Sequence, residues 1–242
     1  MTNAEIKFIK SLSQKKFRDQ SGLFVVEGEK LVAEALASRF SVEKVYRKEE
    51  IGEAAMARIS GLSSPSPALA LVKRPQDLME ASVPAKGLFL ALDGIRDPGN
   101  LGTILRIADW FGIDAVYASE DTVDLFNPKV VQATMGAIFR VQFHYTPLPA
   151  FCSAVLQAGG KVYGTSLDGE NLYGKKLDCG ASKPSVIVVG NEANGISPQT
   201  GACVSDRLYI PPYPPDDPGS ESLNAAVATA VTVAEFRRQG CQ

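Results

Sequence analysis

Apolar runs of strand length alternate with segments of helical periodicity from residue 87 onward. The run at 87–92 is continuously apolar and predicts a buried strand. Apolar residues then recur every three or four positions between 101 and 111, which predicts a helix that ends at Gly112. Further strands are predicted at 113–118, 141–145, 161–165, 185–190 and 207–210, and further helices from 127, at 149–157 and at 222–238. Strands that alternate with helices predict an α/β fold with a mainly parallel sheet and helices on both faces.

The first third of the chain has a shorter pattern of the same kind. Strands are predicted at 24–26 and 42–46, with a helix at 28–38 between them. Turn-forming residues are concentrated at 61–67 and again at 81–87. We therefore expect a small N-terminal α/β domain at 1–85, followed by the larger domain at 86–242.

Length and composition limit the class of protein. The chain has 242 residues, of which 45% are hydrophobic and 21% charged, values typical of a globular protein with one large domain or two small ones. Its apolar runs are far shorter than the ~20 residues of a membrane-spanning helix. The N-terminus lacks the apolar core of a secretory signal, which predicts a cytoplasmic protein without a membrane segment. Four cysteines without a C-x-x-C pair and a single histidine disfavour metal sites, disulfide scaffolds and His-based triads.

The net charge of −2 is unevenly distributed. Residues 1–85 carry 13 Lys and Arg against 11 Asp and Glu, whereas residues 86–242 carry 12 against 16. Five of the N-terminal basic residues lie among the first 20 positions. A basic patch of this kind can bind phosphates, although a solvated helix face explains the same charges.

Three loops that follow predicted strands contain more Gly, Asn, Glu and Ser than a simple connection needs. The loop at 97–106 contains Asn100 and Arg106 as candidate ligand-binding residues. The alternative interpretation is a helix that Asn100 caps, with a solvated arginine. The loop at 188–197 places Glu192 between glycines and asparagines, for which the alternative is a Gly-rich turn. The third loop, 210–224, is stiffened by five prolines and leads into the last helix, which Ser220 or Ser222 could cap.

Common nucleotide-binding and hydrolytic motifs are absent from the sequence. It contains no G-x-G-x-x-G, G-x-x-x-x-G-K-[ST], H-E-x-x-H or G-x-S-x-G. The sequence therefore disfavours a Rossmann dehydrogenase, a P-loop NTPase, a zincin and an α/β-hydrolase.

Taken in order, the three loops resemble the three motifs of the SpoU (TrmH-like) RNA ribose 2'-O-methyltransferases. The matching segments are 100–112 (NLGTILRIADWFG), 190–197 (GNEANGIS) and 210–224, which begins Ile-Pro and ends Ser-Leu-Asn. Segments 15–18 and 22–28 are similar to the small RNA substrate-binding domain that many family members carry. This chain departs from the family pattern in two respects. The segment from Ile210 to Ser222 is longer than in the family, and Ala225-Ala226 replaces the usual Val-Ser.

The resemblance implies an S-adenosylmethionine-dependent enzyme of the SPOUT superfamily, with a C-terminal trefoil knot, acting as a homodimer. Its substrate would be a ribose 2'-hydroxyl of RNA, ribosomal RNA in preference to transfer RNA, and no metal would be needed. A non-catalytic RNA-binding protein that retains the fold is the alternative from a different class. The residues that match the catalytic positions are Asn100, Arg106, Glu192, Ser222 and Asn224; those expected to contact the donor are Thr165, Gly190, Ile210 and Leu223; and those expected to contact RNA are Lys15, Lys16 and Arg18.

Elementary chemistry constrains the roles that the resemblance implies. In-line methyl transfer depends mainly on positioning of the two reactants. A guanidinium keeps its proton at physiological pH, so we expect Arg106 to orient a phosphate, and to act as a base only if a neighbouring cation or the donor itself favours deprotonation. Asn100 would then hold Arg106 or the ribose, and Glu192 would accept backbone amides of the loops.

Overall fold

The chain forms two compact units in the computed structural model, which describes residues 1–75, 83–214 and 219–240. One unit comprises Met1–Gln76 together with Asp124–Arg140, and the other comprises Asp77–Val123 with Val141–Gln242. The segment 124–140 therefore belongs by its contacts to the N-terminal unit, although it follows the predicted boundary near residue 85 by some 40 positions. The independent folding of 1–85 and 86–242 as domains stays a prediction, and residues 76–82 of the connection lie outside the described residues.

The N-terminal unit is built on a three-stranded antiparallel sheet of order β1-β3-β2. The central strand β3 was not predicted, although the apolar residues of its sequence ALALVK form a run of strand length like the one at 87–92. Its elements are α1 (Asn3–Ser11), α2 (Lys15–Ser21), β1 (Leu23–Glu27), α3 (Glu29–Ala37), β2 (Val42–Arg47), α4 (Lys48–Ile51), α5 (Glu53–Ile59), β3 (Ala68–Lys73), α7 (Pro128–Ala133) and the 3₁₀ turn η1 (Ala137–Phe139).

Both faces of this small sheet are covered, which explains why β3 is buried. Leu69 and Leu71 of β3 contact a cluster from α1 and α5 that includes Ile9. On the other face Phe24 of β1 contacts Phe126, with ring centroids 4.6 Å apart. Aromatic contacts of this kind add to the apolar area that they bury, and here they attach the segment 124–140 to the unit.

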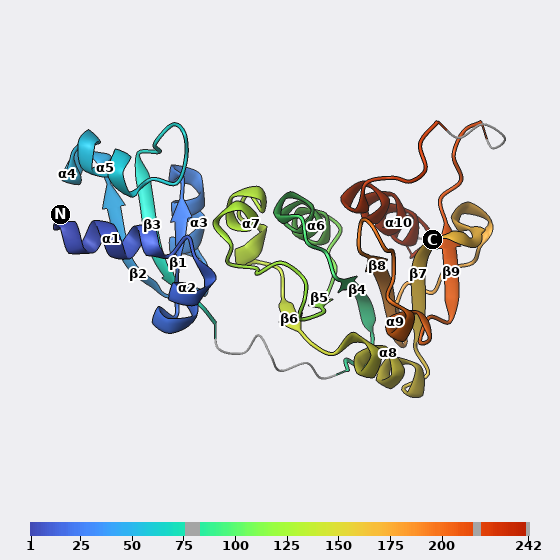
Figure 1. Ribbon diagram of the computed structural model, residues 1–242. Helices are drawn as coiled ribbons and strands as arrows, with labels where there is room; N and C mark the ends of the chain where they lie inside the picture. Colours follow the sequence, from blue (N-terminus) through green and yellow to red (C-terminus); the bar gives the residue numbers. More distant parts are fainter. Residues whose placement is uncertain (76–82, 215–218, 241–242) are drawn as a thin grey trace. The chain divides into compact units, whose positions relative to one another are not determined.

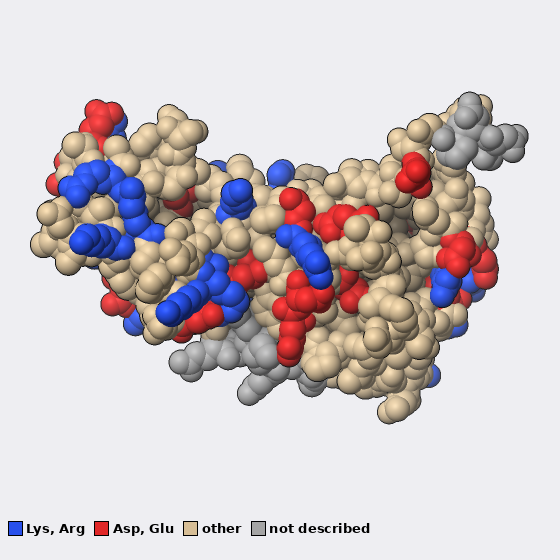
Figure 2. Space-filling model, in the orientation of Figure 1, with Lys and Arg blue, Asp and Glu red and all other residues tan. Residues whose placement is uncertain are grey.

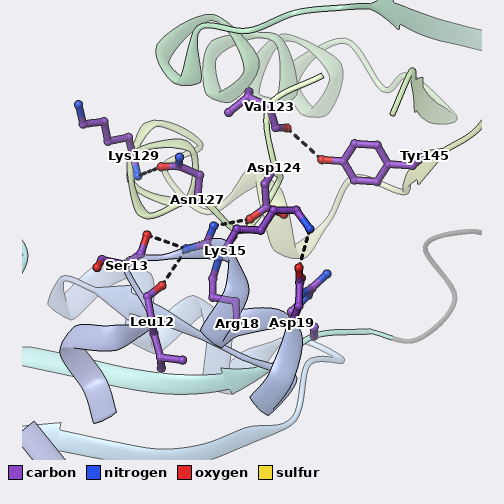
Figure 3. Close-up of polar contacts among 11 residues, drawn as sticks. Leu12, Ser13, Lys15, Arg18, Asp19, Val123, Asp124, Asn127, Lys129 and Tyr145 are labelled. Atoms are coloured by element: carbon purple, nitrogen blue, oxygen red, sulfur yellow. Dashed lines mark hydrogen bonds and ion pairs between the residues drawn. The ribbon is translucent and has the colours of Figure 1, made fainter. Parts of the chain in front are cut away.

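A buried ion pair also ties the segment 124–140 to helix α2 (Figure 3). The guanidinium of Arg18 is only 2% exposed and donates to the Asp124 carboxylate at 2.6 and 3.1 Å. Its remaining nitrogen donates to the carbonyl oxygens of Leu12 and Ser13 at 2.8 and 2.9 Å. Because charges are buried at low cost only when they are paired and hydrogen-bonded, Arg18 fixes the α1–α2 corner and segment 124–140 together.

The C-terminal unit contains a six-stranded sheet of order β6-β5-β4-β8-β7-β9, in which every pairing is parallel. This arrangement confirms the predicted parallel α/β class. Its elements are β4 (Gly87–Asp93), α6 (Pro98–Trp110), β5 (Ala115–Ala118), β6 (Phe143–Tyr145), α8 (Leu148–Gln157), β7 (Lys161–Asn171), η2 (Leu172–Gly174), β8 (Pro184–Gly190), α9 (Pro198–Gly201), β9 (Asp206–Tyr209) and α10 (Ala225–Gly240).

Helices cover this sheet on both sides, as predicted (Figure 1). Alternate residues of β4 and β8, among them Phe89 and Val188, face a core formed with α8, where Phe151 stacks on Tyr117 at 4.0 Å. Helices α6 and α10 pack against each other on the opposite side. Arg237 of α10 donates to the carbonyl oxygen of Phe111 at 2.7 Å and so caps the end of α6.

Most predicted elements are present, with differences at their ends. Helix α6 ends just before Gly112, which has a φ of +60° as its position at the helix end requires. The last helix begins at Ala225 rather than at Ser222. Strand β7 continues to Asn171, beyond the predicted 161–165, through a register shift after Thr165. No helix among the described residues has the length and apolar character needed to cross a membrane.

We predict that breaking the Arg18–Asp124 pair destabilises the N-terminal unit. Asp124→Asn or Arg18→Met leaves one buried polar group without its charged partner, and removing one member of such a pair costs about 3 kcal/mol of unfolding free energy. Urea unfolding followed by circular dichroism measures the loss. Lys15→Ala is the matched control, because its ion pair with Asp19 is exposed and contributes little. An unchanged unfolding midpoint in Asp124→Asn would contradict the structural role of Arg18.

Candidate active site

A cavity of about 1020 Å³ opens in the C-terminal unit where the loops after β7, β8 and β9 meet the start of α10. The strands are parallel, so their carboxyl ends and the loops that follow share one edge of the sheet. All four residues expected to contact the donor line this cavity: Thr165, Gly190, Ile210 and Leu223. Three of the five expected catalytic residues also line it: Glu192, Ser222 and Asn224.

The turn after β8 is tightly closed at Gly190. A Cβ at this position would lie 2.2 Å from the carbonyl carbon of Gly195 and 2.3 Å from the nitrogen of Ile196. Asn191 and Gly195 exchange two backbone hydrogen bonds of 2.9 Å across the turn. Only glycine at position 190 allows the two backbone segments to approach this closely.

Asn191 organises the same turn, and the sequence analysis did not assign it a role. Its side-chain oxygen accepts the backbone amides of Ala193 and Asn194 at 2.9 and 3.2 Å, and its amide donates to the carbonyl oxygen of Gly94 at 2.6 Å. Asn side chains commonly close turns by bonding the backbone two residues on. An Asn directly after a buried strand, as in the Gly-Asn-Glu sequence at 190–192, therefore indicates a residue that closes a turn.

Asn100 joins the first loop to the other two. Its side-chain amide donates to a Glu192 oxygen at 2.8 Å, and the amide of Asn224 donates to its carbonyl oxygen at 2.9 Å. The alternative in which Asn100 merely caps the helix is wrong, because Asp97 caps α6 by accepting the backbone amide of Asn100. The Asp-Pro sequence at 97–98 signals this cap, since Asp favours the N-cap and Pro the first helical position.

The bonding partner of Glu192 and the residue that caps the last helix both differ from what the sequence predicts. No backbone amide among the described residues donates to the Glu192 carboxylate, which instead accepts the side-chain amide of Asn100. Asn224 caps the last helix through the backbone amides of Ala226 and Val227, at 3.0 and 3.3 Å. Ser222 therefore does not cap the helix and is left exposed on the cavity wall.

Arg106 lies on the exposed face of α6, outside the cavity lining. Within the described part of the chain its guanidinium makes no hydrogen bond or ion pair, so the expected contact with Asn100 is not formed. An exposed guanidinium with all its donors available is suited to binding a phosphate.

Polar side chains at the end of β7 form one rim of the cavity. The Thr165 hydroxyl donates to the carbonyl oxygen of Val188 at 3.2 Å, which ties β7 to β8. Arg207 pairs with Asp168 at 2.5 Å. The hydroxyl of Ser166, and then the Arg207 guanidinium, hold the pKa of the Asp168 carboxyl below its usual range. This rim therefore carries a fixed ion pair at neutral pH.

The three residues expected to bind RNA lie on α2 in the N-terminal unit but differ in exposure. Lys15 and Lys16 are exposed, and Lys15 pairs with Asp19 at 2.7 Å. Arg18 is buried and its donors are used by Asp124, Leu12 and Ser13. Because its guanidinium is buried, Arg18 cannot contact an RNA phosphate. The expected RNA-binding role of Arg18 is therefore replaced by a structural role.

Potential metal ligands and nucleophiles are sparse in the described ranges. They contain no group of three or more His, Cys, Asp or Glu side chains arranged to hold a metal ion. Cys152 is buried next to Cys203, and burial raises the pKa of its thiol to about 12. A thiol with so high a pKa is not ionised near neutral pH and is not an active nucleophile.

Two protein families match separate parts of the chain. Residues 87–234 match the SpoU rRNA Methylase family, which covers the unit that contains the cavity. Residues 3–64 match the MRM3-like substrate binding domain. These two matches cover the regions in which the three loops and the N-terminal α/β module lie.

Similar proteins match the chain over nearly its whole length. The 23S rRNA (guanosine(2553)-2'-O)-methyltransferase RlmP of Bacillus subtilis is 31% identical, with 97% of this chain and 96% of the relative covered. The human mitochondrial rRNA methyltransferase 3 is 25% identical, over 94% of this chain and 70% of the relative. The crystal structure of an AdoMet-bound rRNA methyltransferase from Sinorhizobium meliloti is 29% identical, with a TM-score of 0.82 over 98% of this chain and 95% of that one.

We predict that Gly190→Ala destabilises the C-terminal unit. The added methyl group meets backbone atoms that cannot move without opening the turn, and forced packing of this kind costs about 1–3 kcal/mol. Thermal unfolding measures the effect. Gly174→Ala is the matched control, because a Cβ at Gly174 has no atom within 4 Å. Equal unfolding temperatures for the two variants would show that the turn tolerates a side chain.

Proposed function

The chain belongs to the SpoU rRNA methylase family, and from that premise we propose that it transfers a methyl group from S-adenosylmethionine to a ribose 2'-hydroxyl of ribosomal RNA. The observation that carries this proposal is that all four residues expected to contact the donor line one cavity. The Asn100 junction, which places Glu192 and Asn224 at the same cavity, supports a catalytic rather than a purely RNA-binding role.

The cavity fits a methyl donor of this size and chemistry. Its walls combine apolar side chains such as Ile210 and Leu223 with backbone amides and carbonyls, and Gly190 lets the backbone of the turn after β8 close tightly along one wall. Ligand sites of several hundred cubic ångströms usually have this mixture of apolar walls and a few polar groups. When bound, S-adenosylmethionine supplies the methyl group on its positively charged sulfur.

The side chains of this protein position the reacting hydroxyl. We assign Arg106 to a phosphate of the substrate, so that its guanidinium orients the neighbouring ribose toward the cavity. Asn100 holds Glu192 and Asn224 in place and thus fixes the cavity wall. Ser222, exposed on that wall, has a hydroxyl that can hydrogen-bond an incoming ribose.

Ribosomal RNA is favoured over transfer RNA by the extent of the similarity. The rRNA relative from Bacillus subtilis matches 97% of this chain, including the N-terminal unit. A solved tRNA-modifying enzyme of the same fold, from A. aeolicus, covers only 64%. Residues 3–64 match the MRM3-like substrate binding domain, and this match supports the same preference for ribosomal RNA.

A homodimer formed through α6 and α10 is a further part of the proposal, as is the trefoil knot implied by the family resemblance. Trp110 at the end of α6 is 85% exposed, close to the end of α10, where Arg237 donates to the carbonyl oxygen of Phe111. Aromatic side chains such as Trp are enriched at protein interfaces. Arg106 lies one helical turn before Trp110, so an interface that covers Trp110 also encloses Arg106.

We propose a cytoplasmic location on the basis of cysteine chemistry. Cys152 and Cys203 carry free thiols. Thiols remain reduced in the cytoplasm, whereas oxidising compartments favour disulfides.

We predict that Arg106→Ala reduces methyl transfer about a hundredfold or more, because the substrate loses an orienting group that acts in the transition state. Binding of S-adenosylmethionine, measured by calorimetry, should stay unchanged because Arg106 lies outside the cavity lining. Arg96→Ala removes an exposed arginine just before α6 and is the charge-matched control. Transfer of labelled methyl groups to ribosomal RNA is the readout, and undiminished transfer by Arg106→Ala would refute its assigned role.

We predict that Trp110→Glu dissociates the dimer, because a carboxylate would be buried in an apolar interface. Light scattering should give the mass of two chains for the wild type and of one chain for the variant, and methyl transfer should fall with it. Tyr173→Glu, at another exposed aromatic residue of the same unit, is expected to stay dimeric. A wild-type mass of a single chain would rule out the dimer.

A further inference from the structure

Helix α1 exposes an aromatic side chain that its own fold does not use. Ile6 and Ile9 of this helix are buried against the sheet, whereas Phe8 is 41% exposed on the outward side. Three lysines accompany it, Lys7 and Lys10 on α1 and Lys16 at the start of α2, all exposed. We call these four residues the α1–α2 surface.

We propose that the α1–α2 surface binds a single-stranded segment of the RNA substrate, with Phe8 stacked on an unpaired base and the lysines on the flanking phosphates. The inference rests on the proposed function, because it names the part of the RNA that the N-terminal unit recognises.

The lysines of this surface carry uncompensated charge. Among the described residues Lys7, Lys10 and Lys16 form no ion pair. The acidic residues of the two helices are already engaged, Glu5 with Lys44 at 2.9 Å and Asp19 with Lys15 at 2.7 Å. Lys and Arg side chains accordingly gather over α1 and α2 on the visible face of this unit (Figure 2). A surface with excess positive charge attracts the phosphates of a nucleic acid.

The exposed ring distinguishes single-stranded from double-stranded RNA. In a duplex the bases are stacked on one another and expose only their edges, so a phenyl ring finds no base face. Unpaired bases can be splayed out and stacked on aromatic side chains, which is how many proteins recognise RNA loops. An exposed aromatic ring on a helix that also carries exposed lysines therefore fits a loop or single strand better than a helical duplex.

The surface is held rigid before any RNA binds. Helix α1 begins with a capping box, in which Thr2 and Glu5 bond each other's backbone amides. At its other end Arg18 binds the carbonyl oxygens of Leu12 and Ser13, in the turn that leads to α2. A preorganised surface loses less conformational entropy on binding than a mobile one, so Arg18 supports recognition without touching RNA.

Binding of the full-length protein to a short unstructured RNA and to an RNA duplex of equal length tests the proposal. We expect Phe8→Ala to weaken binding of the unstructured RNA about tenfold, in the range measured for loss of one stacked base, with little effect on the duplex. Phe8→Leu should behave like Phe8→Ala, whereas Phe8→Trp should bind as tightly as the wild type. This order separates stacking from simple apolar contact.

Salt dependence tests the lysines separately. Lys7→Ala combined with Lys10→Ala should reduce the slope of log affinity against log salt by about 1.4, the value for two phosphate contacts on single strands, whereas Phe8→Ala should leave the slope unchanged. Lys30→Ala and Leu36→Ala are the matched controls, because both residues are exposed on α3 of the same unit. Circular dichroism verifies that every variant is folded.

Two results would overturn the inference. Unchanged affinity of Phe8→Ala for unstructured RNA would mean that the ring serves another partner, such as a protein. Equal losses for single strand and duplex would mean that the surface recognises charge alone. Donor binding and methyl transfer to saturating ribosomal RNA test the proposed function independently, because Phe8 lies outside the unit that contains the cavity.

Discussion

The site depends on the parallel direction of the strands in the six-stranded sheet. Because all carboxyl ends share one edge, Asn100 can bond to Glu192 and Asn224, which are 92 and 124 positions away in the chain. These two hydrogen bonds hold three loops at one cavity wall. Each loop is also closed from within, by the cap of Asp97, the turn at Asn191 and the cap of Asn224. Local capping fixes the shape of the loops, and the Asn100 junction fixes their mutual position.

The two units use charged residues in different ways. In the N-terminal unit an arginine is buried at the corner of α1 and α2, where four hydrogen bonds compensate its desolvation. That burial leaves neighbouring lysines on a rigid, exposed surface. In the C-terminal unit Arg106 remains exposed and without a partner in the described structure, while the acidic Glu192 is bonded at the cavity. Lys7, Lys10, Lys16 and Arg106 thus face solvent, where phosphates can reach them, and the cavity wall combines apolar side chains with amides.

Sequence patterns predicted the elements well where apolar periodicity is simple. Strands at 87–92 and 185–190 and the helix ending before Gly112 follow directly from continuous or three-and-four spacing. Strand β3 was missed although its apolar run is of the same kind, since a short apolar run by itself does not distinguish a strand from a buried helical segment. The inserted segment 124–140 was missed as part of the N-terminal unit because no local pattern reports which sheet Phe126 will pack against.

The sequence by itself determined the fold class, the order of the loops and several of the residues that line the cavity, because each depends on local periodicity or on a short motif. The tertiary structure decided the partners of those residues. Asn100 bonds side chains from two other loops rather than capping its own helix, and Arg18 is buried by Asp124 although its sequence neighbours are exposed lysines. The physical reason is that a polar side chain bonds to whichever group lies within about 3 Å, and distant segments reach that distance only when the chain folds.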